Sequence, residues 1–291
     1  MNTLSNCPIC NKTKFDKVLS GKDYTVSKDT FTIVSCLSCG FQFTNPIPTI
    51  DKIGDYYKAE SYISHTSSKK GLINRIYHFV RNYTLKQKVR LVHRLAKGNN
   101  VLDIGAGTGH FANALKEAGL NSIGLEPDVD ARALAKSSHA IELLPIEELY
   151  NLADNSQDVV TMWHVLEHVY NLGDDVKQIG KVLKENGTLI VAVPNRLSYD
   201  AKKYGEFWAA YDLPIHLYHF TPADIAKLFE REGMMVKQIL PMRFDAYYVS
   251  MLSEKYKGGS MIRAVWTGFL SNFKAKKGSY SSQIYILQKK S

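Results

Sequence analysis

The four cysteines of this 291-residue chain stand in two pairs, Cys7 with Cys10 and Cys36 with Cys39. Two Cys-x-x-Cys pairs offer four thiolates, a donor set that suits a tetrahedral zinc ion. Because four thiolates leave no open coordination position, the pattern favours a structural zinc over a catalytic one. The doubled pair and the expected cytosolic setting favour zinc over disulfides or free thiols. Such a short segment cannot bury a good core without a metal. Residues 1–48 are therefore predicted to form a small zinc-ribbon-like β module.

A glycine-rich turn follows a short apolar run at residues 100–109, Asn-Val-Leu-Asp-Ile-Gly-Ala-Gly-Thr-Gly. The next residues have helical spacing, so the segment predicts a strand, a tight turn and a helix N-terminus, a geometry that binds nucleotides. Asp103 precedes the first glycine, and Glu126 ends the next predicted strand, where it can accept hydrogen bonds from ribose hydroxyls. Glu126 would also suit NAD, but the third glycine comes one residue too early for Gly-x-Gly-x-x-Gly, which disfavours a dinucleotide oxidoreductase.

Two groups of histidines are candidates for a general base, because histidine titrates near neutral pH. His216 and His219 flank Tyr218 in a loop rich in aromatic residues, and His164 and His168 stand at the start of a predicted helix. Each histidine alone also fits a hydrogen-bonded structural role. We predict that at least one of His216 and His219 lies at the active site as the catalytic base.

The net charge of +9 has one source. Between Ser61 and Leu102 there is no acidic residue, and the apolar residues recur at helical spacing, which predicts two amphipathic helices with a basic outer face within a connector at residues 49–97. A solvated face is the plainer interpretation. The alternative is a surface for an anionic partner such as a phosphorylated substrate, nucleic acid or a membrane. The basic residues are Lys69, Lys70, Arg75, Arg81, Lys86, Lys88, Arg90, Arg94 and Lys97.

From residue 98 onward, predicted strands alternate with helices, which is typical of an α/β fold with a parallel sheet covered on both faces. Ligands bind such sheets at the carboxyl ends of the strands. A capping loop is predicted at 195–221, and an insertion at 242–279 that is helical near Tyr247–Tyr256. No apolar run reaches the length of a membrane span and no signal-peptide core is present, so a cytoplasmic protein is expected. The strands are expected at 101–104, 122–126, 140–143, 158–162, 188–193, 236–240 and 283–287.

Four segments in succession, residues 102–109, 124–128, 158–169 and 183–194, resemble the motifs of class I S-adenosylmethionine-dependent methyltransferases. The resemblance covers about residues 85–290. It implies a doubly wound, mostly parallel, seven-stranded sheet with an antiparallel last strand. It also implies S-adenosylmethionine as cofactor, with the adenine near Ile146 and Glu147 and the methionine part near Trp163 and His164. The implied cofactor-binding residues are Asp103, Gly105, Gly107, Gly109, Glu126, Pro127, Ile146, Glu147, Trp163 and His164.

The N-terminal cysteines are similar to those of a subset of small-molecule methyltransferases, which includes certain sugar C-methyltransferases. This likeness implies methyl transfer to oxygen or carbon of a small acceptor. In ubiquinone-pathway O-methyltransferases and small-RNA methyltransferases a similar Glu-His pair helps to bind a divalent cation. Here Glu167 and His168 match that pair, with His216 or His219 as a further ligand, but His164 stands where an acid is often found, which puts a magnesium site in doubt. The alternative is a zinc-containing nucleic-acid-binding protein, or an RNA methyltransferase, that uses the basic segment 69–97.

Overall fold

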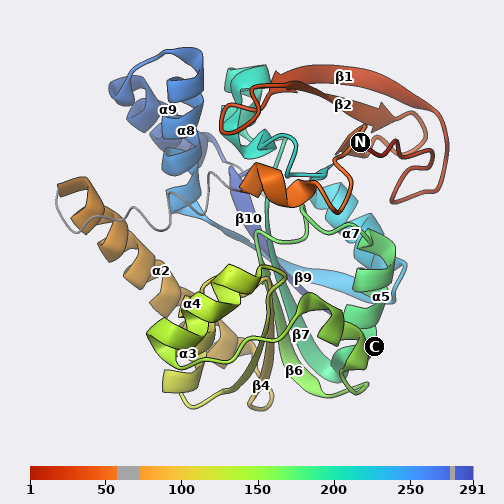
Figure 1. The fold of residues 1–291 in the computed structure, drawn as a ribbon, viewed down its shortest axis with the longest axis vertical. Helices are drawn as coiled ribbons and strands as arrows, with labels where there is room; N and C mark the ends of the chain where they lie inside the picture. Colours follow the sequence, from red (N-terminus) through yellow and green to blue (C-terminus); the bar gives the residue numbers. More distant parts are fainter. Residues whose placement is uncertain (58–71, 276–278, 291) are drawn as a thin grey trace.

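The computed structural model describes residues 1–57, 72–275 and 279–290, with 72–79 as backbone. A central six-stranded sheet has the order β5-β4-β6-β7-β10-β9 (Figure 1). Neighbours among β5, β4, β6 and β7 are parallel, and β10 is antiparallel to both β7 and β9. The predicted α/β class and the antiparallel last strand are thus confirmed. The strands are β4 (Asn100–Ile104), β5 (Asn121–Leu125), β6 (Gln157–Trp163), β7 (Leu183–Pro194), β9 (Met234–Pro241) and β10 (Ser282–Lys289).

The predicted seventh strand at residues 140–143 is wrong. This segment makes only one isolated parallel bridge, between Leu125 and Leu144, and the sheet ends at β5. Ile141 and Leu143 are nonetheless buried, against Ala106 of the glycine turn and against Ala112 and Ala135 of the next two helices along the chain. The apolar spacing of the segment therefore reflects side-chain burial rather than strand pairing, a distinction that periodicity over four residues does not make.

Helices cover both faces of the sheet. Figure 1 shows α2, α3 and α4 on one side, and α5 and α7 on the other. Alternation along the chain produces this arrangement, because each parallel connection must cross from one end of the sheet to the other. The helices are α2 (Leu72–Leu95), α3 (His110–Glu117), α4 (Val129–His139), α5 (Leu172–Val182), α6 (Tyr199–Tyr204), α7 (Pro222–Glu230), α8 (Arg243–Lys257) and α9 (Met261–Lys274), with 3-10 turns η1 (Ile146–Asn151), η2 (Gly205–Phe207) and η3 (Ala209–Tyr211).

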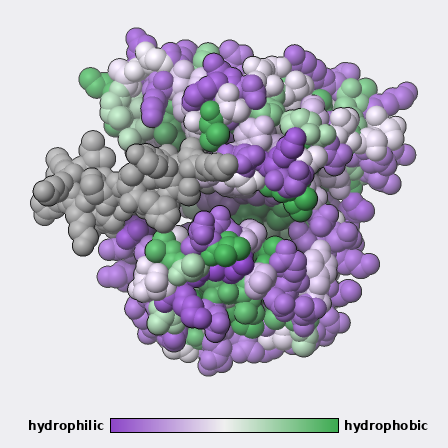
Figure 2. Space-filling model, viewed as in Figure 1, coloured by the Kyte–Doolittle hydropathy of each residue, from purple (hydrophilic) through white to green (hydrophobic). Residues whose placement is uncertain are grey.

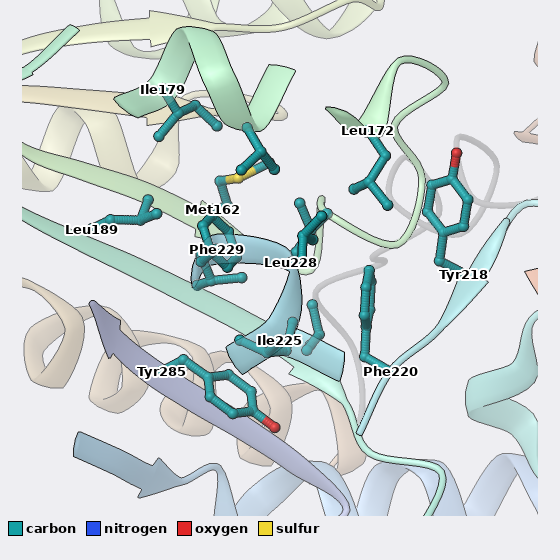
Figure 3. Packing of buried hydrophobic residues seen from close by; sticks show 14 of the residues in the cluster. Met162, Leu172, Ile179, Leu189, Tyr218, Phe220, Ile225, Leu228, Phe229 and Tyr285 are labelled. Atoms are coloured by element: carbon teal, nitrogen blue, oxygen red, sulfur yellow. The ribbon is translucent and has the colours of Figure 1, made fainter. Parts of the chain in front are cut away.

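The main core lies between the sheet and the helices α5 and α7. Figure 3 shows Met162 and Leu189 of the sheet facing Ile179 of α5 and Phe229 of α7. The same cluster continues through Phe220 and Tyr218 into the N-terminal segment, where it includes Phe41, Phe43, Ile47 and two of the cysteines. The first 48 residues therefore share one continuous core with the sheet.

The N-terminal module consists of β1 (Phe15–Lys22), β2 (Thr30–Cys36) and β3 (Gln42–Thr44). Its sheet gains a fourth strand from the capping loop, β8 (Tyr218–His219), which pairs antiparallel with β3. The guanidinium of Arg196 strengthens the junction by donating to the backbone carbonyls of Gly40 and His219, each at 3.0 Å. The module is thereby fixed against the loop that carries the predicted catalytic histidines.

The connector differs from its prediction. Leu72–Leu95 is one helix instead of two, and its basic residues do not all face outward. Lys86, Arg90 and Arg94 are exposed, whereas Lys88 is turned inward and lies 4.3 Å from the ring centre of Trp163. Lys69 and Lys70 lie outside the described residues. The predicted insertion is two helices, α8 and α9, and no described helix is long and apolar enough to cross a bilayer.

Candidate active site

The glycine turn joins the carboxyl end of β4 to α3. Gly105, Gly107 and Gly109 all have positive φ angles, of 72°, 54° and 78°. At Gly105 a side chain is also sterically excluded, because a Cβ atom would lie 2.3 Å from a methyl group of Val165. At Gly107 a Cβ would meet nothing within 4 Å, so there the backbone faces open space. The turn thus presents bare main chain next to a helix N-terminus, as a nucleotide-binding turn requires.

Two acids flank this turn. Glu126, at the end of β5, accepts hydrogen bonds from the backbone N–H groups of Gly107 at 2.7 Å and Asp128 at 3.0 Å. Burial raises its pKa, and the two N–H donors oppose that rise. Asp103 is buried in β4 and accepts from the hydroxyl of Thr161 at 2.6 Å. Burial raises the pKa of Asp103 to about 7, against the opposing effects of Thr161 and Lys88. Both carboxylates therefore lie at the carboxyl end of the sheet, where a cationic or hydroxyl-bearing ligand would stabilise their charged forms.

Unused hydrogen-bonding groups cluster beside the turn. Trp163 Nε1 and Arg81 Nε are both buried without a hydrogen-bond partner among the described residues. Trp163 packs edge-on against Phe111 of α3, and Arg81 lies 3.4 Å from the imidazole of His110. Buried donors without partners are rare in folded proteins because each costs desolvation free energy. Their presence next to the turn supports a polar ligand at this place.

His164 links the end of β6 to the insertion. Its Nε2 lies 2.9 Å from a carboxylate oxygen of Asp245 on α8, and its Nδ1 lies 3.3 Å from Glu167 Oε1. Burial alone would lower the pKa of His164, but the two carboxylates raise it to about 10. The residue also has a φ of 57°, which is uncommon outside glycine. A charged imidazole in a constrained backbone position thus bridges two carboxylates beside Trp163.

Glu167, His168 and His216 form a second cluster, in which one ligand atom from each lies within 4.8 Å of the others. The Nδ1 atoms of His168 and His216 lie 3.1 Å and 2.9 Å from the carbonyl oxygens of Ile215 and Ala210. Nδ1–H groups that donate to carbonyls leave the Nε2 lone pairs free, the arrangement usual for metal-binding histidines. Glu167 Oε2 is buried and has no hydrogen-bond partner among the described residues. The chemistry of these donors fits a divalent cation, with two nitrogens and one oxygen that suit zinc, iron or manganese better than magnesium.

His219 occupies a different environment from His216. It lies on β8, with Nε2 3.1 Å from the hydroxyl of Thr44 and its ring against Tyr211. Burial is the main reason that its pKa falls to about 3, and nearby Arg196 adds to the effect. Its side chain therefore helps to join the module to the capping loop. The structure brings His216, and not His219, together with the Glu-His pair.

The four cysteines meet as predicted, with their sulfur atoms within 4.8 Å of one another. The Sγ atoms of Cys7 and Cys39 are 3.6 Å apart, and those of Cys10 and Cys36 are 3.5 Å apart. Zinc–sulfur bonds of about 2.3 Å place tetrahedral thiolates roughly 3.8 Å apart, so the spacing fits a zinc ion and excludes disulfides in this structure. Burial would raise the pKa of the Cys36 thiol, but N–H groups of Cys39 and Ser38 help to lower it to about 7.

The other predicted cofactor residues lie at the rim of the turn. Pro127 is exposed after β5, Ile146 is partly buried in η1, and Glu147 is exposed beside it. Figure 2 shows this face of the molecule hollowed across its middle, between the N-terminal module and the helices α3 and α4. The carboxyl ends of β4 and β6 point toward this region in the same view (Figure 1).

A six-stranded doubly wound sheet with a glycine turn at the switch between β4 and β6 defines a nucleotide-binding α/β protein. A family model described as "Methyltransferase domain" matches residues 76–239, more than half of the chain. The chain belongs to this family, the S-adenosylmethionine-dependent methyltransferases, and S-adenosylmethionine is its cofactor.

Individual relatives agree with the family. A protein of Mycolicibacterium smegmatis described as a probable S-adenosylmethionine-dependent methyltransferase is 30% identical over 67% of this chain and 72% of the relative. A ubiquinone biosynthesis O-methyltransferase of Azorhizobium caulinodans is 28% identical over 52% of this chain and 65% of the relative. The crystal structure of an S-adenosylmethionine-dependent methyltransferase from Thermotoga maritima has a TM-score of 0.50 at 19% identity, covering 74% of this chain and 96% of that one, and this likeness shows the fold.

Three polar groups at the site were missed by sequence reasoning: Lys88, Thr161 and Asp245. Thr161 is one short polar residue in a strand read as part of the core, and Lys88 is one of several basic residues in its helix, so neither stands out in the sequence. Asp245 lies in the insertion, whose packing no motif indicates. A usable signal was present only for Lys88, which falls seven residues after Arg81 and thus on the same face of the helix.

The bridge at His164 predicts an unusual titration. In the intact protein we expect its imidazole to stay charged until about pH 10. The charged bridge therefore contributes stability that is fully present below the pKa of an unfolded histidine, near 6.5, and is lost as the pH rises through about 10. Substituting Asp245→Asn removes one carboxylate and should lower the titration midpoint by about one pH unit or more. Ring NMR signals, assigned by comparison with His164→Gln, measure the midpoint. Asp130→Asn, an exposed acid on α4, is the control, and equal midpoints in the two Asp variants would refute the bridge.

Proposed function

We propose that the protein transfers the methyl group of S-adenosylmethionine to an oxygen or carbon atom of a small-molecule acceptor. The observation that carries the proposal is the juxtaposition of the glycine turn, which follows β4, with the cluster of Glu167, His168 and His216 beyond the same end of the parallel neighbour β6. The similarity to a ubiquinone biosynthesis O-methyltransferase favours oxygen. The acceptor atom attacks the methyl carbon, the carbon–sulfur bond breaks and S-adenosylhomocysteine leaves, and the proton of a hydroxyl acceptor must go to a base. In-line positioning supplies much of the acceleration, because the sulfonium methyl is already activated.

For the cofactor we propose that Asp103 receives the amino group of the methionine part and Glu126 the ribose hydroxyls. Lys88 and Arg81, on one face of α2, are proposed to hold the carboxylate. Their support is the position of Lys88 over Trp163 and the buried donor of Arg81 without a partner. Gly105, Gly107 and Gly109 supply the bare turn, with Pro127, Ile146 and Glu147 along the adenine and Trp163 and His164 beside the methyl group.

For the acceptor side we propose a divalent cation held by Glu167 Oε2 and the Nε2 atoms of His168 and His216. Such an ion would lower the pKa of an acceptor hydroxyl and orient it. The protein's own part is to hold both imidazoles through their Nδ1–H groups and to leave Oε2 of Glu167 without another partner among the described residues, while Oε1 pairs with His164. His216 is thereby proposed as a ligand or, without a metal, as the base. His219 remains a proposed catalytic residue only through its position in the same loop, since Thr44 occupies its Nε2.

At the cysteine cluster we propose a structural zinc ion, supported by the four close sulfurs. The nucleic-acid alternative has less support, because Lys88 of the basic segment is turned toward the sheet and the relatives are methyltransferases.

Cofactor binding should depend on Lys88 far more than on a neighbouring lysine. Lys88→Met removes a charge-assisted hydrogen bond, worth about 1.5–3 kcal/mol, and should weaken S-adenosylhomocysteine binding by roughly tenfold or more. Lys86 is an exposed residue of the same helix, and Lys86→Met should leave the affinity within about twofold of that of the parent protein. Calorimetric titration gives the affinities, and the thermal midpoint of each free variant reports any loss of fold. Equal affinities in both variants would contradict the carboxylate assignment.

Methyl transfer should be cation-dependent if the second cluster binds a metal. Incubation with methyl-labelled cofactor and fractionated metabolite extract identifies the acceptor from its labelled product. Chelator treatment should reduce the rate, and Mn²⁺ or Zn²⁺ should restore it in the parent protein but not in Glu167→Gln. Glu148→Gln, at a partly exposed residue of the turn η1, is the control. A chelator-insensitive rate would exclude the metal, and absence of any labelled small molecule would contradict the proposed acceptor class.

Purified protein should contain about one tightly bound zinc ion per chain. Cys36→Ser should lose this ion and lower the thermal midpoint, whereas Ser38→Ala in the same turn and Glu167→Gln in the second cluster should retain it. Elemental analysis after dialysis gives the stoichiometry. A folded parent protein without metal would refute the zinc site, and loss of the ion in Glu167→Gln would mean that it occupies the other cluster.

A further inference from the structure

Helix α9 buries its small side chains and exposes its large apolar ones. Ala264, Thr267, Gly268 and Ser271 face inward, and Gly268 packs closely on Tyr247 of α8. On the outer face, Ile262 is 82% exposed and Phe273 is 75% exposed. This is the reverse of the pattern that stabilises a water-soluble helix on a globular protein. The complete outer set is Met261, Ile262, Val265, Trp266, Phe269 and Phe273.

The exposed side chains form one continuous stripe along the helix. Apart from Met261, they recur at spacings of three and four residues, which places them on one face of a helix. The rings of Trp266 and Phe269 stack with centroids 5.6 Å apart, and those of Phe269 and Phe273 with centroids 6.0 Å apart. Figure 1 shows α9 at an outer corner of the molecule beside α8, and apart from the sheet. Continuous apolar surfaces of this kind mark sites of interaction.

The charge around the stripe is positive. From Lys255 to the last residue the chain has no Asp or Glu and eight Lys or Arg. The helical hairpin formed by α8 and α9 exposes four basic residues, Lys255, Lys257, Arg263 and Lys274. Its two acids do not offset this charge at the stripe, because Glu254 is buried near Tyr204 and Asp245 pairs with His164. The hairpin therefore combines an aromatic and aliphatic stripe with a cationic border.

We propose that α9 docks on an anionic lipid bilayer, with its apolar stripe in the interface and the lysines and arginine at the headgroups. Tryptophan, phenylalanine and aliphatic residues on one face, with cations beside them, are the composition of interfacial helices. Self-association through the same face would bring two cationic hairpins together, and like charges oppose that contact. An anionic surface complements both the stripe and its border.

Vesicle flotation tests this proposal. The full-length protein should float with vesicles of phosphatidylcholine and phosphatidylglycerol, and much less with phosphatidylcholine alone. Ile262→Ser should lower the partition coefficient by roughly tenfold, because the variant no longer has an isoleucine side chain to bury in the apolar phase of the bilayer. Ile50→Ser is the matched control, since Ile50 is 72% exposed and belongs to the N-terminal part of the chain. Its partition should equal that of the parent protein.

A second pair of variants tests the cationic border. The triple change Lys255→Gln, Lys257→Gln and Arg263→Gln should reduce binding to anionic vesicles, while the same change at the exposed Lys86, Arg90 and Arg94 of α2 should not. Absence of binding to anionic vesicles would overturn the proposal, as would equal binding by Ile262→Ser and Ile50→Ser. Sedimentation that shows a dimer of the parent protein, converted to monomer by Ile262→Ser without any vesicle binding, would overturn it in favour of a second copy.

Discussion

The arrangement of the site depends on the pairing of the buried carboxylate of Glu167 with His164. A fully buried carboxylate is costly unless a positive partner and hydrogen bonds offset its desolvation. His164 supplies the positive partner through Oε1, and Asp245 in turn keeps His164 charged. The backbone carbonyl of the same glutamate accepts hydrogen bonds from the N–H groups of Leu217 and Tyr218. Glu167, in the loop that follows β6, therefore holds α8 through His164 and Asp245 on one side, and the capping loop through its backbone carbonyl on the other.

The local features of this fold could be predicted because their causes lie within a few residues. The glycine turn follows from three glycines and an apolar strand, and the cysteine cluster follows from paired spacing. The failures concern partners distant in sequence. Asp245 meets His164 across 81 residues, and Thr44 meets His219 across 175. Periodicity also misled at 140–143, where two apolar side chains are buried without strand pairing.

The capping loop shows why two nearby histidines, His216 and His219, can have different roles. In β8 successive side chains point to opposite faces, and β3 fixes the register by pairing Gln42 with His219. The side chain of His219 thereby lies beside Thr44, whose hydroxyl is 3.1 Å from its Nε2. His216 precedes the strand, where its N–H group bonds to the carbonyl of Asp212 and its ring packs edge-on against His168. The spacing of the two histidines suggested equivalence, whereas strand pairing with the N-terminal module separates them.

That pairing also gives the N-terminal module a physical role beyond its own stability. Its core is continuous with that of the sheet, and its last strand carries β8. Phe41 and Phe43 connect the cysteine cluster to the loop that carries His216, because the ring of Phe41 packs against Tyr218 and Phe220. Packed cores transmit displacement because they contain few voids. With the proposed zinc bound, the module would be a rigid support for the proposed acceptor side, the glycine turn would support the proposed cofactor side, and Glu167 would join the two supports beyond the end of β6.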